Sequence, residues 1–439
     1  MSPSVAFYTL GCKVNQYDTQ LLMERFKKRG YTIVEFEGPA DVYVVNSCAV
    51  TGRSVARSKQ VLRNALKRNP RALLVMTGCF PQVRFEEAAH MGEVGVVSGT
   101  ANREGLVDLV DRALREGCRF VEVGRVEAKD WPRDGITGFC GRTRAFLKVQ
   151  EGCQEFCSYC IVPYARGPMR SRPGDDVLRE ASRLAKAGFA EIVLTGTHLA
   201  AYSWAGWDLC TLLKELEGIQ GIRRIRLSSV EPLDVTQALI EAMAQSPKVC
   251  HHLHLPLQSG SDRILEKMNR KYSTRYFKQL VSSLRNLMPE IGISTDVMVG
   301  FPGETDEDFE YTRSMVKECG FSRLHVFRFS PRPGTPAACM EDQVPAKVKS
   351  ARAAQLIADG KQLAIDFARR FVGQPMEVLV EEERDEGGNL LGFTSNYIRV
   401  SFPGSDRLIG QIVKVCITLP GDKVSAGELC GENRGRENE

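Results

Sequence analysis

The chain has 439 residues, 14 cysteines and a formal net charge of +5. Its length predicts two to four domains, and its ordinary balance of apolar and charged residues excludes wholesale disorder and fibrous proteins. No run approaches the roughly 18 apolar residues of a membrane span, and the N-terminal residues lack the basic and apolar segments of a signal peptide. We therefore expect a cytoplasmic protein with reduced thiols, whose cysteines serve metal binding, catalysis or burial instead of a disulfide framework.

The first part of the chain alternates short β-rich runs with helix-patterned segments. Strands are expected at residues 5–10, 42–45, 73–76 and 94–97. This alternation predicts a parallel, Rossmann-like sheet with helices on its faces. We assign residues 1–116 to this N-terminal domain and the poorly patterned stretch 117–143 to a linker.

A second series of strands follows the expected linker. Its strands are expected at residues 144–150, 191–195, 224–227, 252–257, 293–299 and 324–329. About six βα units are too few for a closed eightfold barrel but enough for a partial (βα)6 barrel. With the helical stretch 347–371, this series defines a second domain at 144–371.

The C-terminal part has a different pattern and a different charge. Alternating runs at 376–380, 396–400 and 412–417 predict a small β-barrel over residues 372–433, followed by a tail at 434–439. Residues 372–439 carry 7 basic and 12 acidic side chains, a net charge of −5, so the part of the chain before them carries +10. The modest overall charge therefore hides a basic body and an acidic C-terminal region.

One helical segment of the N-terminal domain is strongly basic. Between positions 53 and 71 there is no acidic residue but seven bases: Arg53, Arg57, Lys59, Arg63, Lys67, Arg68 and Arg71. Three of them recur every fourth residue and therefore share a helix face. The run indicates either a contact with the phosphates of a nucleic acid or an ordinary solvated helix face.

The strongest local signal is a group of three cysteines after the first strand of the second series. Cys153, Cys157 and Cys160 follow the pattern C-x3-C-x2-C. Three thiolates this close favour a polynuclear iron–sulfur cluster. A structural zinc site or an electron-transfer cluster needs a fourth ligand, and none lies nearby in the sequence. A four-iron cluster on three cysteines leaves one iron open to a small molecule; three buried structural cysteines are the alternative.

This triad resembles the signature of radical S-adenosylmethionine (SAM) enzymes, which use a partial (βα)6 barrel. The resemblance implies that the three cysteines hold a catalytic [4Fe–4S] cluster, whose open iron binds SAM before SAM is cleaved to an adenosyl radical. Stretches at later strand ends also match, where ligand sites gather in parallel sheets. They supply the expected SAM contacts: Thr195, Gly196, Ser229, Glu231, Gln258 and Asp296. Taken singly, such residues can also be ordinary strand-end caps.

Three further cysteines are related through the expected topology. Cys12, Cys48 and Cys79 each lie just past the end of a predicted strand, and successive members are separated by one βα unit or so. Because the carboxyl ends of parallel strands meet at one edge of a sheet, the three can converge on one crevice. A preceding Gly or Ser permits a tight turn and a close backbone approach. The pattern favours a second three-cysteine cluster over scattered free cysteines.

The whole arrangement resembles the methylthiotransferase family, which has an N-terminal cluster domain, a radical SAM domain and a C-terminal TRAM β-barrel. Residues 11–17, 46–51 and 152–167 are similar to the branch that modifies N6-threonylcarbamoyladenosine at tRNA position 37. In place of Lys13-Val14, the isopentenyl-adenosine branch tends to have Gln-Met and the branch acting on a ribosomal-protein aspartate Pro-Lys. The resemblance implies that Cys12, Cys48 and Cys79 hold a second [4Fe–4S] cluster.

The implied reaction places a methylthio group on C2 of the modified adenine. That carbon bears a non-acidic hydrogen, which general-base chemistry cannot remove and a radical can. Following the family, the Cys153 triad would generate the radical, and the Cys12 triad would carry the sulfur that a second SAM methylates. The implied partners of a monomeric enzyme that binds no membrane are tRNA and an electron donor of flavodoxin or ferredoxin type.

Other interpretations stay open from the sequence. A sister methylthiotransferase would act on isopentenyl-adenosine tRNA or on a ribosomal-protein aspartate, and a non-catalytic iron–sulfur RNA-binding sensor would never turn over SAM. The resemblance of the small barrel to TRAM domains implies that it contacts tRNA, but its net acidic charge does not favour binding to phosphates. The basic helix at 53–71 is therefore the better electrostatic candidate for that contact. The other cysteines are expected to be incidental: Cys118, Cys140, Cys210, Cys250, Cys319, Cys339, Cys416 and Cys430.

Overall fold

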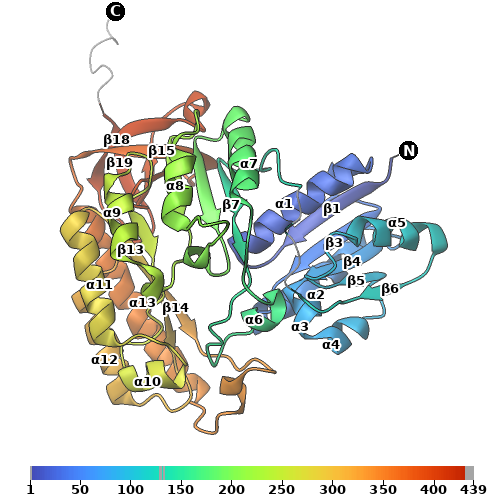
Figure 1. Cartoon of the computed structure of the whole chain (residues 1–439), viewed down its shortest axis with the longest axis horizontal. Helices are drawn as coiled ribbons and strands as arrows, with labels where there is room; N and C mark the ends of the chain where they lie inside the picture. Colours follow the sequence, from blue (N-terminus) through green and yellow to red (C-terminus); the bar gives the residue numbers. More distant parts are fainter. Residues whose placement is uncertain (1, 128–130, 132–133, 431–439) are drawn as a thin grey trace, which may run out of the picture.

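The computed structural model describes residues 2–127, 131 and 134–430. Its N-terminal lobe is a six-stranded parallel sheet in the order β2-β1-β3-β4-β5-β6 (Figure 1). The predicted runs are confirmed as β1 (Ser4–Thr9), β3 (Val42–Ser47), β4 (Leu73–Gly78) and β5 (Val96–Ser98). Two strands were not predicted, β2 (Thr32–Val34) and β6 (Phe120–Glu122). Both are three-residue edge strands without a buried apolar run, and β6 lies inside the stretch expected to be a linker.

Helices cover both faces of this sheet because alternate strand residues face opposite sides. Val42 and Val44 pack with α1 (Lys13–Lys28) and α5 (Leu106–Glu116) on one face. Tyr43 and Val45 pack on the other face, which is covered by α2 (Gly52–Arg68), α3 (Cys79–Val83) and α4 (Phe85–Ala89). The predicted Rossmann-like α/β lobe is confirmed.

The central body is a partial barrel of six parallel strands. They are β7 (Arg144–Lys148), β10 (Glu191–Thr195), β11 (Arg224–Leu227), β12 (His252–His254), β13 (Gly292–Val299) and β14 (Arg323–Arg328). The order β7-β10-β11 continues into β12-β13-β14 through the parallel bridges Ile225–Val249 and Ser229–His254. The outer helices are α7 (Gly174–Lys186), α8 (Leu209–Glu217), α9 (Gln237–Gln245), α10 (Asp262–Lys267), α11 (Thr274–Leu287), α12 (Asp306–Cys319) and α13 (Ala346–Arg369).

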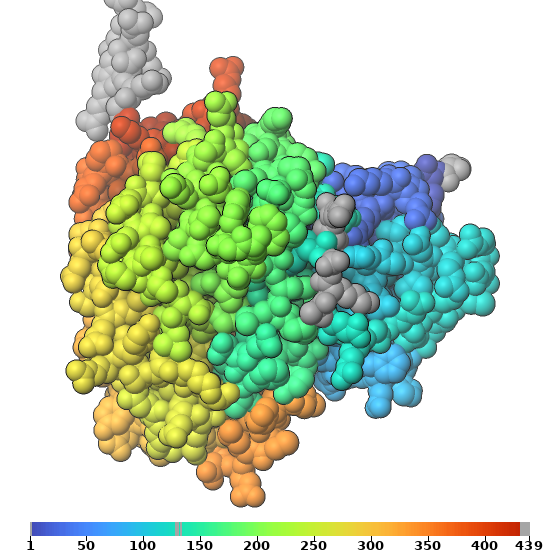
Figure 2. All heavy atoms as spheres, viewed as in Figure 1, coloured from blue at the N-terminus to red at the C-terminus, as the bar shows by residue number. Residues whose placement is uncertain are grey.

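The N-terminal lobe docks on the open side of this barrel. In Figure 1, α1 lies between the N-terminal sheet and β7, and Figure 2 shows the lobe projecting beside the larger body. Tyr17 of α1 belongs to the apolar core of the barrel, and Leu21, one turn later, packs against that core. The two domains therefore share part of one core across α1.

The C-terminal region is the expected small barrel. It closes in the order β15-β16-β17-β19-β18, with β15 (Pro375–Arg384), β16 (Leu390–Thr394), β17 (Arg399–Phe402), β18 (Ile412–Leu419) and β19 (Ser425–Leu429). Arg224 and Arg226 of β11 donate to its backbone carbonyls at Phe393 and Ser395, at 3.1 and 2.9 Å. Because Arg224 begins β11, whereas the cysteine loop follows the carboxyl end of β7, the small barrel covers the end of the central barrel opposite the cysteine loop. Within the described residues, no helix is long and apolar enough to cross a membrane.

One expectation about the cysteines is wrong. Cys416 and Cys430, expected to be unpaired, form a disulfide with a Cα–Cα distance of 5.6 Å. Cys416 lies in β18, and Cys430 directly follows the neighbouring antiparallel strand β19, where its N–H donates to the Lys414 carbonyl at 2.9 Å. The pairing depends on strand register, which residue spacing alone did not reveal.

Candidate functional site

Three cysteines meet at the edge of the N-terminal sheet. Cys12, Cys48 and Cys79 follow β1, β3 and β4, which are adjacent strands. Gly11 has a φ of +106°, and a Cβ there would lie 2.9 Å from the Cβ of Cys48, so only glycine fits this approach. The convergence expected from the parallel topology is therefore present.

Asn15 connects the loops that carry these cysteines. Its side-chain amide donates to the carbonyls of Leu10 and Ser47 at 2.7 and 3.0 Å. Its Oδ1 lies 3.8 Å from the Sγ of Cys79 and accepts a hydrogen bond from Arg166. Asn15 thus fixes the strand ends and brings Arg166, from the central domain, beside the N-terminal triad.

The second triad lies in one loop of the central body. Cys153, Cys157 and Cys160 lie between β8 (Gln150–Glu151) and α6 (Val162–Arg166). The N–H of Cys160 donates to the Cys157 carbonyl at 2.9 Å, which forms a tight turn. The buried guanidinium of Arg270 lies 3.5 Å from the Sγ of Cys157 through Nη1. Each triad therefore has one buried arginine beside it.

The protonation of the buried cysteine thiols is consistent with the binding of an iron–sulfur cluster, in which iron replaces the thiol protons. Burial raises the pKa of Cys48 and of Cys160 to about 12, and it also raises the pKa of Cys79 and Cys157, although Arg166 and Arg270 oppose the shift at the last two. Iron binds the thiolate and displaces the proton, so the donor set fits iron–sulfur chemistry. Among the residues described, no group of three or more His, Cys, Asp or Glu side chains could hold a single metal ion.

A cavity of about 110 Å³ adjoins Cys157. Its charged lining is of both signs: Glu155, Glu231, Asp234, Arg270 and Lys271, with His198 beside them. Glu231 accepts a hydrogen bond from Arg270, which also approaches Cys157. Opposite charges of this kind complement a zwitterionic amino acid, and methionine in SAM is one.

The six predicted SAM contacts are only partly brought together. Glu231 lines the cavity at Cys157, and the N–H of Gln258 donates to the Asp296 carbonyl at 2.8 Å on the neighbouring strand. Thr195 is buried at the end of β10, and a Cβ on Gly196 would lie 3.0 Å from Gln150. Ser229 is exposed beyond β11. Thr195 ends β10 and Gly196 follows it, whereas Asp296 lies in the middle of β13 and not at its end. Glu231 is the one of the six that lines this cavity.

Sequence reasoning missed two side chains at this triad, Arg270 and His198. His198 lies with its Nδ1 3.9 Å from the Sγ of Cys153 and its Nε2 2.5 Å from Asp234. Burial lowers the pKa of His198, but Asp234 and Cys153 outweigh it and raise the pKa to about 10. Neither residue belongs to a repeated spacing, so only the three-dimensional arrangement reveals them.

The N-terminal triad contacts the segment that directly follows the central triad. Cys79 packs with Ala49 of its own lobe and with Ile161 and Ala165 of the central body. Ile161 directly follows Cys160. On the same boundary, Arg332 donates through Nε to the Val50 carbonyl at 2.9 Å, just after Cys48 in the chain. The N-terminal triad and the segment that follows the central triad therefore share this boundary.

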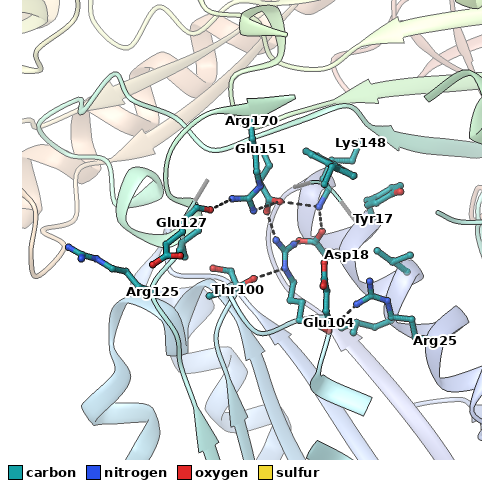
Figure 3. Close-up of a pocket in the computed structure, with 16 residues that line it drawn as sticks. Tyr17, Asp18, Arg25, Thr100, Glu104, Arg125, Glu127, Lys148, Glu151 and Arg170 are labelled. Atoms are coloured by element: carbon teal, nitrogen blue, oxygen red, sulfur yellow. Dashed lines mark hydrogen bonds and ion pairs between the residues drawn. The ribbon is translucent and has the colours of Figure 1, made fainter. Parts of the chain in front are cut away.

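A buried charge network holds this boundary together. Arg166 donates to Asp18 and Glu151 at 2.6 and 2.5 Å, and Arg103 donates to Glu151 at 2.7 Å. Asp18, Lys148, Glu151 and Arg170 point toward one another in Figure 3 and line a cavity of about 160 Å³. Burial opposes ionisation of Asp18, but the surrounding cations lower its pKa to about 2. No predicted site residue lines this cavity, and each of its two central carboxylates is paired with several cations.

The basic helix is partly neutralised by its own lobe. Lys59 of α2 forms an ion pair with Glu87 of α4, and the Nε of Arg63 lies 3.9 Å from a carboxylate oxygen of Glu93. Arg53, Arg57 and Lys67 are exposed and have no ion-pair partner among the residues described. The positive charge of α2 that is free to contact a polyanion therefore comes mainly from its exposed arginines and Lys67.

Three family models match the chain in order. The model described as "Uncharacterized protein family UPF0004" matches residues 4–99, "Radical SAM superfamily" matches 147–316, and "TRAM domain" matches 369–429. The matches correspond to the N-terminal lobe, most of the central barrel and the small C-terminal barrel.

Curated relatives match nearly the whole chain. A threonylcarbamoyladenosine tRNA methylthiotransferase MtaB of Bacillus subtilis is 41% identical, covering 97% of this chain and 96% of the relative. Its namesake of Aquifex aeolicus is 40% identical, covering 94% and 100%. A tRNA-2-methylthio-N(6)-dimethylallyladenosine synthase of Clostridium novyi is 37% identical, covering 96% and 95%.

Solved structures agree in fold. The radical SAM methyltransferase TsrM from Kitasatospora setae, solved with cobalamin and a [4Fe–4S] cluster, superposes with a TM-score of 0.57 at 16% identity over 77% of each chain. This likeness concerns the fold alone. On the strength of the full-length relatives and the matched domains, the chain belongs to the radical SAM tRNA methylthiotransferase family, whose enzymes use SAM and [4Fe–4S] chemistry.

Proposed function

We propose that this enzyme transfers a methylthio group to C2 of N6-threonylcarbamoyladenosine at position 37 of tRNA, with one [4Fe–4S] cluster on each cysteine triad. The observation that carries the proposal is the contact of Cys79, in the N-terminal triad, with Ile161, which directly follows the last cysteine of the central triad. The substrate is supported by the relatives: three named for threonylcarbamoyladenosine are 38–41% identical, whereas those named for dimethylallyladenosine are 36–37% identical.

The side chains around the central triad have distinct roles in this proposal. When bound, SAM and a reduced cluster supply a carbon radical able to take hydrogen from an unactivated carbon. Arg270 orients Glu231 and the Cys157 side of the triad. The charges of Glu231 and Arg270 bind the ammonium and carboxylate of the methionine part of SAM, and His198 is held in place by Asp234.

The N-terminal triad has the role of sulfur carrier. Cys12, Cys48 and Cys79 hold the second cluster, and Asn15 keeps their loops together. Ile161 and Ala165 cover Cys79 on the side of the central body. An adenine placed at this boundary would meet the radical from one side and the sulfur from the other, and the proposed chemistry requires that arrangement.

The proposed partners and domains follow from this division of labour. The domains are residues 1–116, 144–371 and 372–433, joined by 117–143, although β6 extends the first sheet to Glu122. The enzyme acts in the cytoplasm as a monomer on tRNA and takes electrons from a donor of flavodoxin or ferredoxin type. The acidic barrel is docked at the far end of the central barrel, and the exposed bases of α2 are the better electrostatic candidates for the contact with tRNA.

Mass spectrometry of tRNA nucleosides tests the substrate. Cells that lack the gene should lose 2-methylthio-N6-threonylcarbamoyladenosine and accumulate its unthiolated precursor, and the wild-type gene should restore it. A Cys48→Ala gene should fail to restore it. Loss of the methylthiolated isopentenyl nucleoside instead would assign the chain to the sister activity, and unchanged nucleosides would contradict the proposal.

A further inference from the structure

Two aromatic side chains are exposed beside the central triad. Phe156 lies between Cys153 and Cys157, and Tyr164 lies on α6, which begins two residues after Cys160. Phe156 is 49% exposed and Tyr164 is 48% exposed, and their ring centroids lie 6.0 Å apart in an edge-to-face arrangement. Single exposed apolar residues are common on protein surfaces, whereas two exposed rings in contact form a small aromatic platform.

The backbone at Phe156 is strained and is held in place. Its φ is +46°, in the left-handed region that a bulky residue rarely adopts. The side-chain amide of Asn269 donates to the carbonyls of Glu155 and Phe156, at 3.3 and 3.0 Å. Strained conformations persist where the surroundings fix them, and they gather at sites that bind ligands. The fold therefore keeps this aromatic ring at the surface at a conformational cost.

The aromatic platform adjoins both parts of the candidate site. The residue before Phe156 lines the cavity of about 110 Å³ at Cys157. The residue after Tyr164 packs with Cys79 of the N-terminal triad. A group that stacks on the platform is therefore a neighbour of the place where the proposed reaction holds its adenine.

Arginines lie on the same boundary. A Cβ on Gly52, the first residue of α2, would lie 3.0 Å from Nη1 of Arg332, and the exposed Arg53 follows Gly52. Gly334 lies in the same loop as Arg332 and approaches α6, because a Cβ there would lie 4.0 Å from Cδ1 of Ile161. Proteins bind single-stranded nucleic acids with this combination, in which aromatic rings stack on bases and cations contact phosphates.

We infer that Phe156 and Tyr164 form a stacking platform for the unpaired base next to position 37 in the anticodon loop of tRNA. The inference rests on the proposed function, which brings the adenine of position 37 to this boundary. An enzyme that acts on a ring atom of a base must take that base out of its stack. The adjacent base then loses its stacking partner, and the aromatic platform replaces it. Because every base has a π-face, the platform holds the loop without reading its sequence.

A fluorescent anticodon stem-loop RNA, bound to the reconstituted full-length holoenzyme, tests the inference. The RNA carries the threonylcarbamoyl group at position 37 and 2-aminopurine at the position before it or, in a second RNA, after it. Stacking on an aromatic ring quenches this probe. Tyr164→Ala should therefore brighten the bound probe in one of the two RNAs and raise the Kd about tenfold. Tyr164→Phe should retain the quenching and the Kd.

A control variant separates stacking from general damage. Tyr311→Ala removes an aromatic ring that is 53% exposed on α12, and it should change neither the quenching nor the Kd. Phe156→Leu keeps an apolar side chain but lacks a ring, and it should repeat the effect of Tyr164→Ala. Its iron content is measured as well, because Phe156 neighbours Cys157; Tyr164, which neighbours no cysteine, decides the matter if that variant loses iron.

Two outcomes would overturn the inference. The first is a wild-type Kd and wild-type quenching in Tyr164→Ala, and the second is an equal loss in Tyr164→Phe, which would assign the effect to the hydroxyl group. Both leave the proposed function intact. Failure of the proposed function is seen separately, when the nucleoside missing from deletion cells is not the threonylcarbamoyl derivative.

Discussion

The two cysteine triads reach the same boundary by different routes. Cys153, Cys157 and Cys160 lie close together in one short loop, so their proximity is a property of local sequence. Cys12, Cys48 and Cys79 are widely spaced in the sequence and meet only because β1, β3 and β4 are parallel neighbours. The first group depends on a local loop and the second on the arrangement of a sheet. Substitutions in the two groups should therefore have different effects on the reaction.

The largest effect is expected at the central triad. Cys157→Ala should abolish formation of 5′-deoxyadenosine and, with it, all tRNA modification, because the cluster loses one of its three ligands. Chromatography of an anaerobic reaction with dithionite measures the product. Cys118→Ala, which changes an exposed free cysteine, is the matched control. Normal SAM cleavage in the Cys157 variant would show that this triad does not hold the cluster that forms the radical.

The N-terminal triad should fail selectively. Cys48→Ala should retain SAM cleavage to 5′-deoxyadenosine yet yield no methylthiolated tRNA, because radical formation requires only the intact central triad. The same chromatography, combined with mass spectrometry of the RNA, separates the two activities. A variant that still thiomethylates tRNA would remove the sulfur-carrier role from this triad.

The boundary between the triads offers a test of stability. Arg166→Met would remove buried hydrogen bonds to Asp18 and Glu151 while Arg103 and Lys148 still pair with both acids, so it should lower the free energy of unfolding by about 2 kcal/mol. Urea denaturation of the reconstituted protein measures the change. Arg179→Met, which breaks an ion pair of a mostly exposed arginine on α7, should cost less than about 1 kcal/mol. Equal effects of the two substitutions would show that the buried network stabilises the fold no more than an exposed ion pair does.

The smallest effect is expected on the outer surface of the N-terminal lobe. Reversing Arg53, Arg57 and Arg63 to glutamate should raise the Kd for tRNA about tenfold and flatten its dependence on salt, because fewer counterions are released. Reversal of Arg112 and Arg115 on α5, at the opposite face of the sheet, serves as the control. If both sets of changes act alike, α2 is an ordinary solvated helix.

The same contrast explains what could be predicted from the sequence. The central triad was visible in residue spacing, and the N-terminal triad became visible once the alternating strands implied a parallel sheet. Arg270 and His198 were not found, because a single arginine or histidine carries no periodic signal. The Cys416–Cys430 bridge was missed because it depends on the register of β18 and β19.

The charged network at the lobe boundary illustrates a further limit. Asp18 lies on α1 and Glu151 ends β8, far along the chain in the next domain, and Arg166 connects them. In the sequence each is an ordinary charged residue, which is usually exposed. Only the docking of α1 on the barrel turns them into buried partners, so tertiary contact decides their role.

The central claim is that each triad holds its own four-iron cluster. Iron and sulfide analysis of anaerobically reconstituted protein, combined with Mössbauer spectroscopy, tests it most directly. The account predicts about eight irons per chain in wild type and about four when Cys153, Cys157 and Cys160 are all replaced by alanine, with the complementary four lost when Cys12, Cys48 and Cys79 are replaced. About four irons in wild type, all lost with the central triad, would contradict the account.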